Sequence, residues 1–223
     1  MNAILRDSVT ARRVYVFLLT LATLAYLVPR WLSPPAWMSP PGPTDAALPA
    51  PRALLAAVPV APGERHRVVG YEREAFGDGW GMARVTGLEH CTSREAALAV
   101  QSRPRATGCE PAAVIEDFYG DTRVFPFERL EADHVFPLAA AWDMGAWAWD
   151  DAQRVEFAND PLNLVITTRA ANQDKSDQLP SRWMPPARTR HCWYAQRLAA
   201  VAHAYALALP AADHRALRHA CRL

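Results

Sequence analysis

The sequence predicts an α+β fold in which a β-hairpin and the helix after it form the core. The first observation is a short β-branched strand, Leu164 to Thr167, followed by Thr168, which is suited to cap a helix that runs to about Gln178. The second is the pair Asp133-His134, which we expect at the end of the partner strand. The third is an apolar set at helical spacing, which predicts an amphipathic helix of about five turns: Tyr194, Leu198, Val201 and Tyr205.

The N-terminal segment, residues 1–32, has the features of an export signal. Val14 to Val28 form an uncharged run of 15 residues, preceded by Arg12 and Arg13. A helix that spans a bilayer needs roughly 20 apolar residues, so this run is closer in length to the apolar part of a signal peptide. We expect an uncleaved membrane anchor, with a cleaved signal peptide as the alternative. Either one predicts an exported protein, on the periplasmic or extracellular face.

Residues 33–63 are rich in proline and alanine, which predicts a stiff, extended linker. The folded domain is then expected over residues 64–223, as one domain and as a monomer. Its first strand is expected at Val68-Val69-Gly70-Tyr71.

Turn and capping residues mark the other elements before the core. Ser93 is a candidate N-cap for a helix through Val100. Val114 to Tyr119 and Thr122 to Phe125 are expected as strands, because Gly120-Asp121 between them is a turn signal.

Helices are expected around and after the core strands. An alanine-rich stretch runs from Leu138 to Trp142, and a helix candidate follows from Asp150 to Ala158. Pro210 ends the long amphipathic helix, and a shorter helix is expected from Ala211 to Cys221.

The overall charge does not indicate a nucleic-acid partner. The chain carries 24 basic and 23 acidic residues, and setting aside the four arginines and two aspartates of residues 1–50 leaves a balance of −1. Nucleic-acid-binding domains usually show a basic footprint. Any phosphate-binding surface must therefore be local.

The four cysteines fit an oxidising compartment. There is no C-x-x-C pair in the sequence, so a cysteine zinc knuckle has no ligands. Of the three possible pairings, Cys91 with Cys109 and Cys192 with Cys221 is the natural one, and free buried thiols are the alternative.

The residues that could carry chemistry lie between Glu131 and Trp183. Hydrolysis of a phosphodiester needs a base for water, a cation for the developing charge and a group that orients the base. His134 is a candidate base, and the carbonyl of Asn163 could accept its ring N–H and select the tautomer. Asp133 and Asn172 are oxygen ligands suited to Mg²⁺ or Mn²⁺, with Zn²⁺ or Ni²⁺ as alternatives.

The motifs resemble those of a nuclease family. The pattern runs DH-V-x-P, then N-L, then N-x-x-K-S-D. It is similar to the HNH, or ββα-metal, endonucleases, in the variant whose last histidine is asparagine. The wider match covers most of Tyr71 to Tyr205 and resembles the exported bacterial HNH endonucleases related to the nuclease part of GmrSD-type restriction enzymes. Its further motifs are Tyr71-x-Arg73-x-x-Phe76-Gly77, Cys91-Thr92-Ser93-Arg94, Phe157-Ala158-Asn159-Asp160-Pro161 and Trp183-x-Pro185-Pro186.

The resemblance implies a ββα-metal core hairpin plus helix, decorated by N-terminal strands and a helix and by C-terminal helices. It implies His134 as general base, Asp133 and Asn172 as ligands of one divalent metal, and Asn163 as the residue that orients His134. Lys175, the single lysine of the chain, would lie near the scissile phosphate. The expected substrate is DNA, with RNA as the alternative.

Simpler uses of the same residues remain open. Asn163 also suits a turn after Pro161, and Lys175 also suits a solvated helix surface. Arg73 and Arg94 could contact phosphate or form ion pairs within the domain. A second function class is a catalytically inactive, membrane-tethered module that binds nucleic acid or protein. The complete set of base, ligands and orienting amide favours the enzyme.

Overall fold

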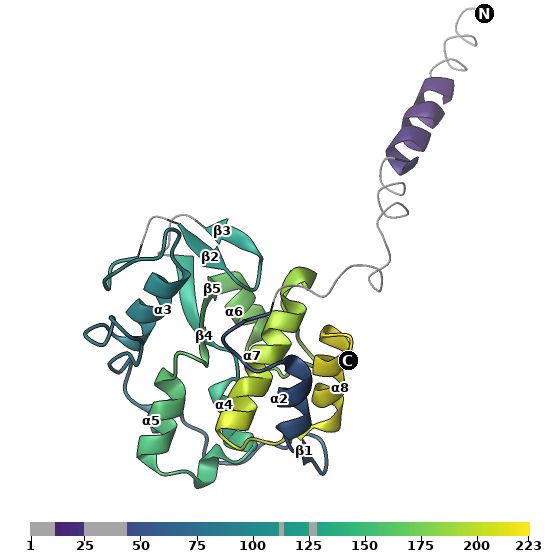
Figure 1. The fold of residues 1–223 in the computed structure, drawn as a ribbon. Helices are drawn as coiled ribbons and strands as arrows, with labels where there is room; N and C mark the ends of the chain where they lie inside the picture. Colours follow the sequence, from purple (N-terminus) through teal and green to yellow (C-terminus); the bar gives the residue numbers. More distant parts are fainter. Residues whose placement is uncertain (1–11, 25–43, 112–113, 125–128) are drawn as a thin grey trace, which may run out of the picture. The chain divides into compact units, whose positions relative to one another are not determined.

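A computed structural model describes residues 12–24, 44–111, 114–124 and 129–223 of the chain. Contacts divide the chain into two compact units, Met1–Pro40 and Pro41–Leu223. In the first unit, residues 12–24 form a helix, drawn in purple in Figure 1. Among the described helices, none is both long and apolar enough to cross a membrane. The predicted apolar run continues to Val28, and its last part lies outside the described residues.

The second unit is an α+β structure, as the sequence predicts. Its described residues form three two-stranded sheets. A parallel pair joins β1 (Val60–Ala61) to β6 (Leu209–Pro210), and antiparallel pairs join β2 (Ile115–Asp117) to β3 (Thr122–Val124) and β4 (Leu130–His134) to β5 (Leu164–Thr168).

The α-helices found among the described residues of this unit are α2 (Pro51–Ala57), α3 (Ser93–Gln101), α4 (Leu138–Asp143), α5 (Asp151–Asn159), α6 (Arg169–Lys175), α7 (His191–Ala204) and α8 (Ala211–Ala220), with a 3-10 turn η1 (Arg73–Phe76) before α3. From α3 onwards these helices follow the predicted order, whereas α2 was not predicted. Asp150 and Thr168 cap α5 and α6 through side-chain hydrogen bonds, as expected of these residue types.

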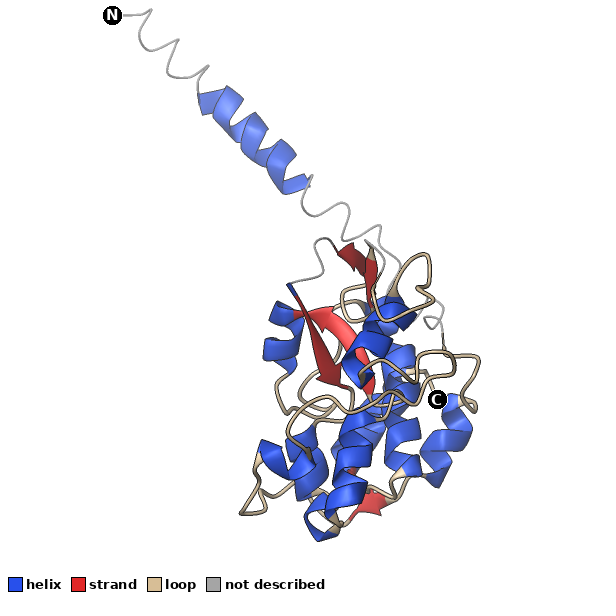
Figure 2. Cartoon of the chain, turned by 90° about the vertical axis from the view of Figure 1, so that its left-hand side faces the viewer, coloured by secondary structure: helices blue, strands red, loops and turns tan. Residues whose placement is uncertain are grey.

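The β4–β5 pair and α6 form one continuous unit at the centre of the domain. Strand β4 ends at His134, which lies opposite Leu164, the first residue of β5. Helix α6 begins directly after β5 and packs against both strands. Helix α3 and strand β2 pack against β5, so neighbouring elements cover the β4–β5 pair (Figure 2). The end of β4 is therefore held on several sides.

The main core lies between α7 and its neighbours. Figure 1 shows α2 and α8 beside α7, and both helices contact it. The side chains of Leu54 and Leu55 on α2 are buried in this core. The predicted linker, residues 33–63, is therefore wrong for α2 and β1, because burial of these leucines stabilises the segment as part of the fold. Residues 33–43 of the predicted linker lie outside the described residues.

Two local predictions also need correction. Residues 68–71 form a turn rather than a strand: Gly70 has a φ of 91°, and the Val68 N–H donates to Asp143 instead of to a neighbouring strand. The N-cap of α3 is Thr92 rather than Ser93, because Thr92 and Glu95 form a capping box. The Ser93 hydroxyl instead donates to Asn159.

The predicted disulfide pairing is confirmed. Cys91 is bonded to Cys109 beneath α3, and Cys192 is bonded to Cys221, which joins α7 to α8. Two disulfides and no free cysteine fit a chain that folds in an oxidising compartment.

We expect the Cys192–Cys221 bond to contribute strongly to stability. It closes a chain segment of 29 residues between two packed helices. Loop-closure entropy predicts that replacing both cysteines by serine lowers the free energy of unfolding by about 3–4 kcal/mol. Urea denaturation of the oxidised proteins measures this difference. A loss below about 1 kcal/mol would mean that α7 and α8 keep their packing without the crosslink.

Candidate active site

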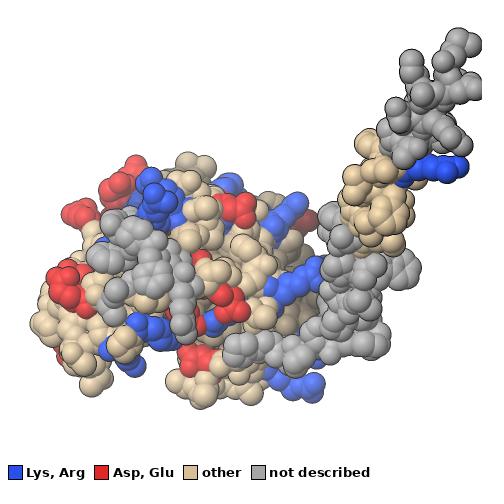
Figure 3. Space-filling view, turned by 90° about the horizontal axis from the view of Figure 1, so that it is seen from above, with Lys and Arg blue, Asp and Glu red and all other residues tan. Residues whose placement is uncertain are grey.

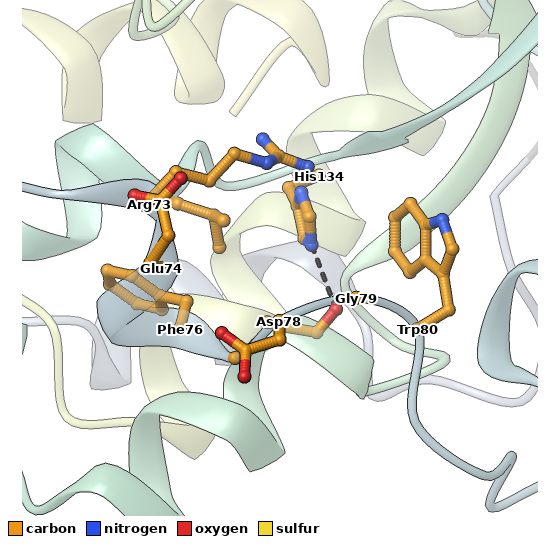
Figure 4. Close-up of a pocket in the computed structure, with 10 residues that line it drawn as sticks. Arg73, Glu74, Phe76, Asp78, Gly79, Trp80 and His134 are labelled. Carbon is orange, nitrogen blue, oxygen red and sulfur yellow. Dashed lines mark hydrogen bonds between the residues drawn. The ribbon is translucent and has the colours of Figure 1, made fainter.

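The imidazole of His134 is buried at the end of β4 and has a fixed tautomer. Its Nε2 lies 2.8 Å from the carbonyl oxygen of Ala158, at the end of α5 (Figure 4). A carbonyl oxygen can only accept, so Nε2 carries the proton and Nδ1 carries a lone pair. Figure 4 shows the second ring nitrogen on the side of Arg73. The ring is therefore arranged as a proton acceptor.

Burial keeps this imidazole neutral. It lowers the pKa of His134 from 6.5 to about 4, against the Ala158 carbonyl and the Asp133 carboxylate, which both act to raise it. The positive charges of Arg73 and Lys175 add to the lowering. At neutral pH the ring is therefore unprotonated and can take a proton from water.

Asp133 is held by two donors. Its Oδ2 accepts a hydrogen bond of 2.7 Å from the hydroxyl of Tyr119 and lies 2.9 Å from Nζ of Lys175. Burial, and then the charge of Asp133, raise the pKa of Tyr119 well above its ordinary value, so its hydroxyl stays a donor. Within the described residues, Oδ1 of Asp133 accepts no hydrogen bond. That oxygen is available to a ligand.

The structure contradicts the expected place of Lys175. Its side chain is 0% exposed, and Nζ donates to the backbone carbonyl of His134 at 2.7 Å as well as pairing with Asp133. An ammonium group so enclosed cannot lie against a phosphate in the solvent-exposed cleft. Lys175 instead supports both residues of the Asp133-His134 pair from below.

Asn163 also acts differently from the prediction. Its side chain is fully buried, and Oδ1 accepts from the backbone N–H of Phe136 at 2.8 Å rather than from His134. The ring N–H of His134 goes to Ala158 instead. The Asn163 backbone carbonyl accepts from Val135 N–H at 2.8 Å. Asn163 thus fixes the bend that follows His134, and it acts on the imidazole through the backbone.

Asn172 lies on α6 near the base of β4. Its Nδ2 donates to Glu131 at 2.8 Å, and among the described residues its Oδ1 accepts no hydrogen bond. Burial acts to raise the pKa of Glu131, but hydrogen bonds from Arg169 and Asn172 outweigh it and the pKa is lowered. Glu131 therefore stays a carboxylate that orients the Asn172 amide.

One open cavity brings three of the predicted residues together. Asp133, His134 and Asn172 all line a cavity of about 490 Å³, whereas Asn163 and Lys175 lie outside its lining. The backbone bends at Val135 and Phe136, directly after the strand ends. Asp133 and His134 are adjacent residues at the end of β4, and both line this cavity.

Part of the remaining lining comes from outside the central strands and α6. Arg67, Tyr71 and Arg73 line the cavity from the segment before α3. Of these, the motifs singled out Tyr71 and Arg73. The roles of Tyr119 and of the Ala158 carbonyl carried no sequence signal, because each depends on a contact between distant elements.

The fold and these residues define an α+β protein with a buried His–Asp pair at the end of a central strand. Residues 110–219 match the family described as GmrSD restriction endonucleases, C-terminal domain. The chain is therefore a relative of the GmrSD-type nucleases, as its motifs predict. The matched segment contains β4, β5 and α6, and so Asp133, His134 and Asn172.

One curated protein resembles part of the chain. It is described as an uncharacterized secreted protein of Arthroderma benhamiae and is 40% identical over 90 residues. The similarity covers 40% of this chain and 44% of that protein, so the chain spans less than half of the relative's length. No solved structure matches the chain closely enough for comparison.

The buried ion pair generates a stability prediction. Replacing Lys175 by Met leaves the Asp133 carboxylate, which is 7% exposed, without its positive partner. We expect a loss of about 3–5 kcal/mol in the free energy of unfolding, measured by urea denaturation. The double variant Lys175→Met, Asp133→Asn serves as control, because removing the charge should restore part of the loss. Additive losses would show that the two charges do not interact.

The low pKa of His134 generates a second prediction, for the protein in EDTA. Between pH 6.5 and about 4 the unfolded chain binds a proton on this histidine and the folded chain does not. The contribution of His134 to the free energy of unfolding is therefore fully present above pH 6.5. As the pH drops, the free energy of unfolding falls by up to roughly 3 kcal/mol near pH 4. Urea denaturation at pH 7 and 4.5 measures it. His134→Gln, which does not titrate, should lose this part of the pH dependence, and an unchanged dependence would refute the assignment.

Proposed function

We propose that the chain is a divalent-metal-dependent endonuclease that hydrolyses phosphodiester bonds, with DNA favoured as substrate and RNA as the alternative. The observation that carries the proposal is the arrangement of the open cavity. A neutral imidazole with an unprotonated Nδ1 lines the same space as two oxygens without partners in the described structure, Asp133 Oδ1 and Asn172 Oδ1. These are the groups that metal-assisted phosphodiester hydrolysis requires.

His134 would act as the general base. Its Nε2–H bond to the Ala158 carbonyl fixes the ring, and this bond also stabilises the positive charge that forms when Nδ1 accepts a proton from water. A pKa lowered by burial keeps the base unprotonated at neutral pH. Lys175 and Tyr119 would act as positioning residues, because they hold Asp133 and the end of β4 without lining the cavity.

The residues present fit a hard divalent ion. Mg²⁺ and Mn²⁺ take oxygen ligands and retain several waters, so one carboxylate and one amide oxygen suffice. Asp133 and Asn172 would hold the ion. When bound, it would neutralise charge on the phosphate and on the leaving 3′-oxygen. The Lys175 ammonium occupies the opposite carboxylate oxygen, Oδ2, which leaves Oδ1 for the ion.

The comparisons support the class of reaction and the compartment. The matched family is described by its restriction endonuclease activity, and a nuclease-related domain implies contact with nucleic acid. The partial relative is described as secreted, and the two disulfides fit export, so we propose that this chain also acts outside the cytoplasm. Anchoring through residues 1–32 stays part of this proposal.

The purified chain is expected to nick plasmid DNA in the presence of Mg²⁺ or Mn²⁺. His134→Ala should reduce the rate by about 10²–10⁴-fold, because it removes the base, and EDTA should abolish cleavage. Agarose gels measure the conversion of supercoiled to open-circular DNA. Arg105→Gln, an exposed arginine in the loop closed by Cys91–Cys109, is the matched control and should cleave normally.

Calorimetry with Mn²⁺ separates metal binding from activity in the same set of proteins. Asp133→Ala should lose binding, while His134→Ala should retain it. The proposed nuclease activity would be refuted if no divalent metal supported cleavage of double-stranded DNA, single-stranded DNA or RNA. That result would favour the membrane-tethered binding module instead.

A further inference from the structure

A second cavity lies on the other side of His134. It has a volume of about 260 Å³ and is lined by η1 and the glycine-containing loop after it, from Arg73 to Trp80. Figure 4 shows Trp80 and Arg73 on different sides of the His134 ring, with Asp78 below. Arg73 and His134 line both this cavity and the one that contains Asp133. The two cavities therefore meet at Arg73 and His134.

Arg73 is a positive charge without a direct ion-pair partner among the described residues at this junction. Among the described residues it forms no ion pair and no hydrogen bond, whereas Arg67, the other arginine of the first cavity, is paired with Asp177 at 2.6 Å. A guanidinium group offers several N–H donors in a planar fork that matches phosphate oxygens. Arg73 is thus free to receive an anion beside the proposed base.

The backbone that carries Arg73 is anchored to the domain by packing and a hydrogen bond. Phe76 of η1 is buried against Phe157 and Trp142, with ring centroids 6.2 and 6.4 Å apart. Nε of Arg154 on α5 donates to the carbonyl of Ala75 at 3.1 Å. Because η1 is anchored to α5, which also supplies the Ala158 carbonyl, Arg73 and His134 share one scaffold.

Trp80 is held in place next to the imidazole. Its ring stacks on His134, with centroids 5.7 Å apart and planes inclined by 21°. Gly77 has a φ of 102°, which favours glycine and lets the chain turn sharply after η1. On the other side of Trp80, the N–H of Gly81 donates to Oδ1 of Asn159 at 2.7 Å. The aromatic wall of the cavity is therefore fixed from both ends.

The chemistry of the second cavity differs from that of the first. Its rim carries the exposed carboxylates of Glu74 and Asp78, which repel a phosphate but accept N–H donors such as those of nucleobases. Phe76, Trp80 and Leu138 supply apolar lining. The cavity is thus suited to a flat, uncharged group with N–H donors, next to a site suited to an anion.

We propose that residues 73–80 form the substrate-binding half of the site. Arg73 binds the phosphate that is cut, and the cavity between Arg73 and Trp80 receives a nucleoside attached to that phosphate. This inference rests on the proposed nuclease function. It assigns substrate binding to a segment that lies before residue 110, outside the part of the chain that matches the GmrSD family.

The surface charge agrees with such a local contact. The face seen in Figure 3 mixes basic and acidic side chains without a continuous basic area. The described residues on that face offer no broad basic area for many phosphate contacts along a duplex. One guanidinium at the reacting phosphate and one nucleoside pocket would then contribute much of the recognition.

The test of Arg73 is a binding measurement on the full chain in EDTA, where no cleavage occurs. Fluorescence anisotropy with a single-stranded oligonucleotide should show about tenfold weaker binding for Arg73→Gln. The slope of log K against log salt should fall by about one, as expected for one lost phosphate contact. Arg105→Gln is the matched control. Equal affinity and slope for Arg73→Gln and the control would overturn the phosphate assignment.

The test of the nucleoside cavity compares small diesters with the same leaving group in the presence of Mn²⁺. The substrates are the 3′- and 5′-(4-nitrophenyl phosphate) of thymidine, and methyl 4-nitrophenyl phosphate, which has no nucleoside. Trp80→Ala should lower kcat/KM for one thymidine diester by about tenfold, in the range of base–aromatic stacking, and leave the methyl diester within threefold. Trp80→Phe should restore most of the difference. An equal loss on all substrates would mean that Trp80 only supports His134. It would overturn the proposal that this cavity binds a nucleoside.

The two proposals fail in different ways. Loss of hydrolysis in EDTA and in His134→Ala supports the nuclease whatever the variants of Arg73 and Trp80 do. Hydrolysis by the wild-type chain with no effect of either variant would reject the substrate-binding segment and keep the nuclease. Nucleic-acid binding that depends on Arg73, without any hydrolysis, would support the phosphate contact of Arg73 and reject the proposed nuclease activity.

Discussion

The hydrogen bond from His134 to the carbonyl of Ala158 is the contact around which the site is organised. The last carbonyls of a helix lack partners within the helix, so the end of α5 offers acceptors to other elements. Ala158 uses its carbonyl to hold His134, and the Asn159 side chain holds Gly81 and therefore Trp80. One helix end thus positions the proposed base and the wall of the neighbouring cavity, and the tautomer of the imidazole follows from the same bond.

A second constraint lies beneath the site, in the buried pair of Lys175 and Asp133. Burying two charges has a large desolvation cost, which the pair offsets only with good geometry and further hydrogen bonds. Both conditions hold here, since Lys175 also bonds the His134 carbonyl and Asp133 also accepts from Tyr119. The pair joins α6 to β4, so the cavity oxygens keep their positions relative to the imidazole.

The two halves of the cleft come from different parts of the chain. The segment related to the GmrSD endonucleases contains the proposed base and metal ligands, whereas Arg67, Arg73 and Trp80 come from the region before it. This division fits the general separation between a rigid scaffold and the segments that select a ligand.

Local features were predictable from the sequence, because they depend on neighbouring residues. Examples are β5 followed by the Thr168-capped α6, the strand end at His134, and the pairing of Cys91 with Cys109. Tertiary structure alone decided the partners of buried polar groups. Asn163 was expected at the imidazole and clamps Phe136, and Lys175 was expected at the substrate and lies under Asp133. A side chain's residue type states which hydrogen bonds it can make, but packing between distant elements determines which partner is within reach.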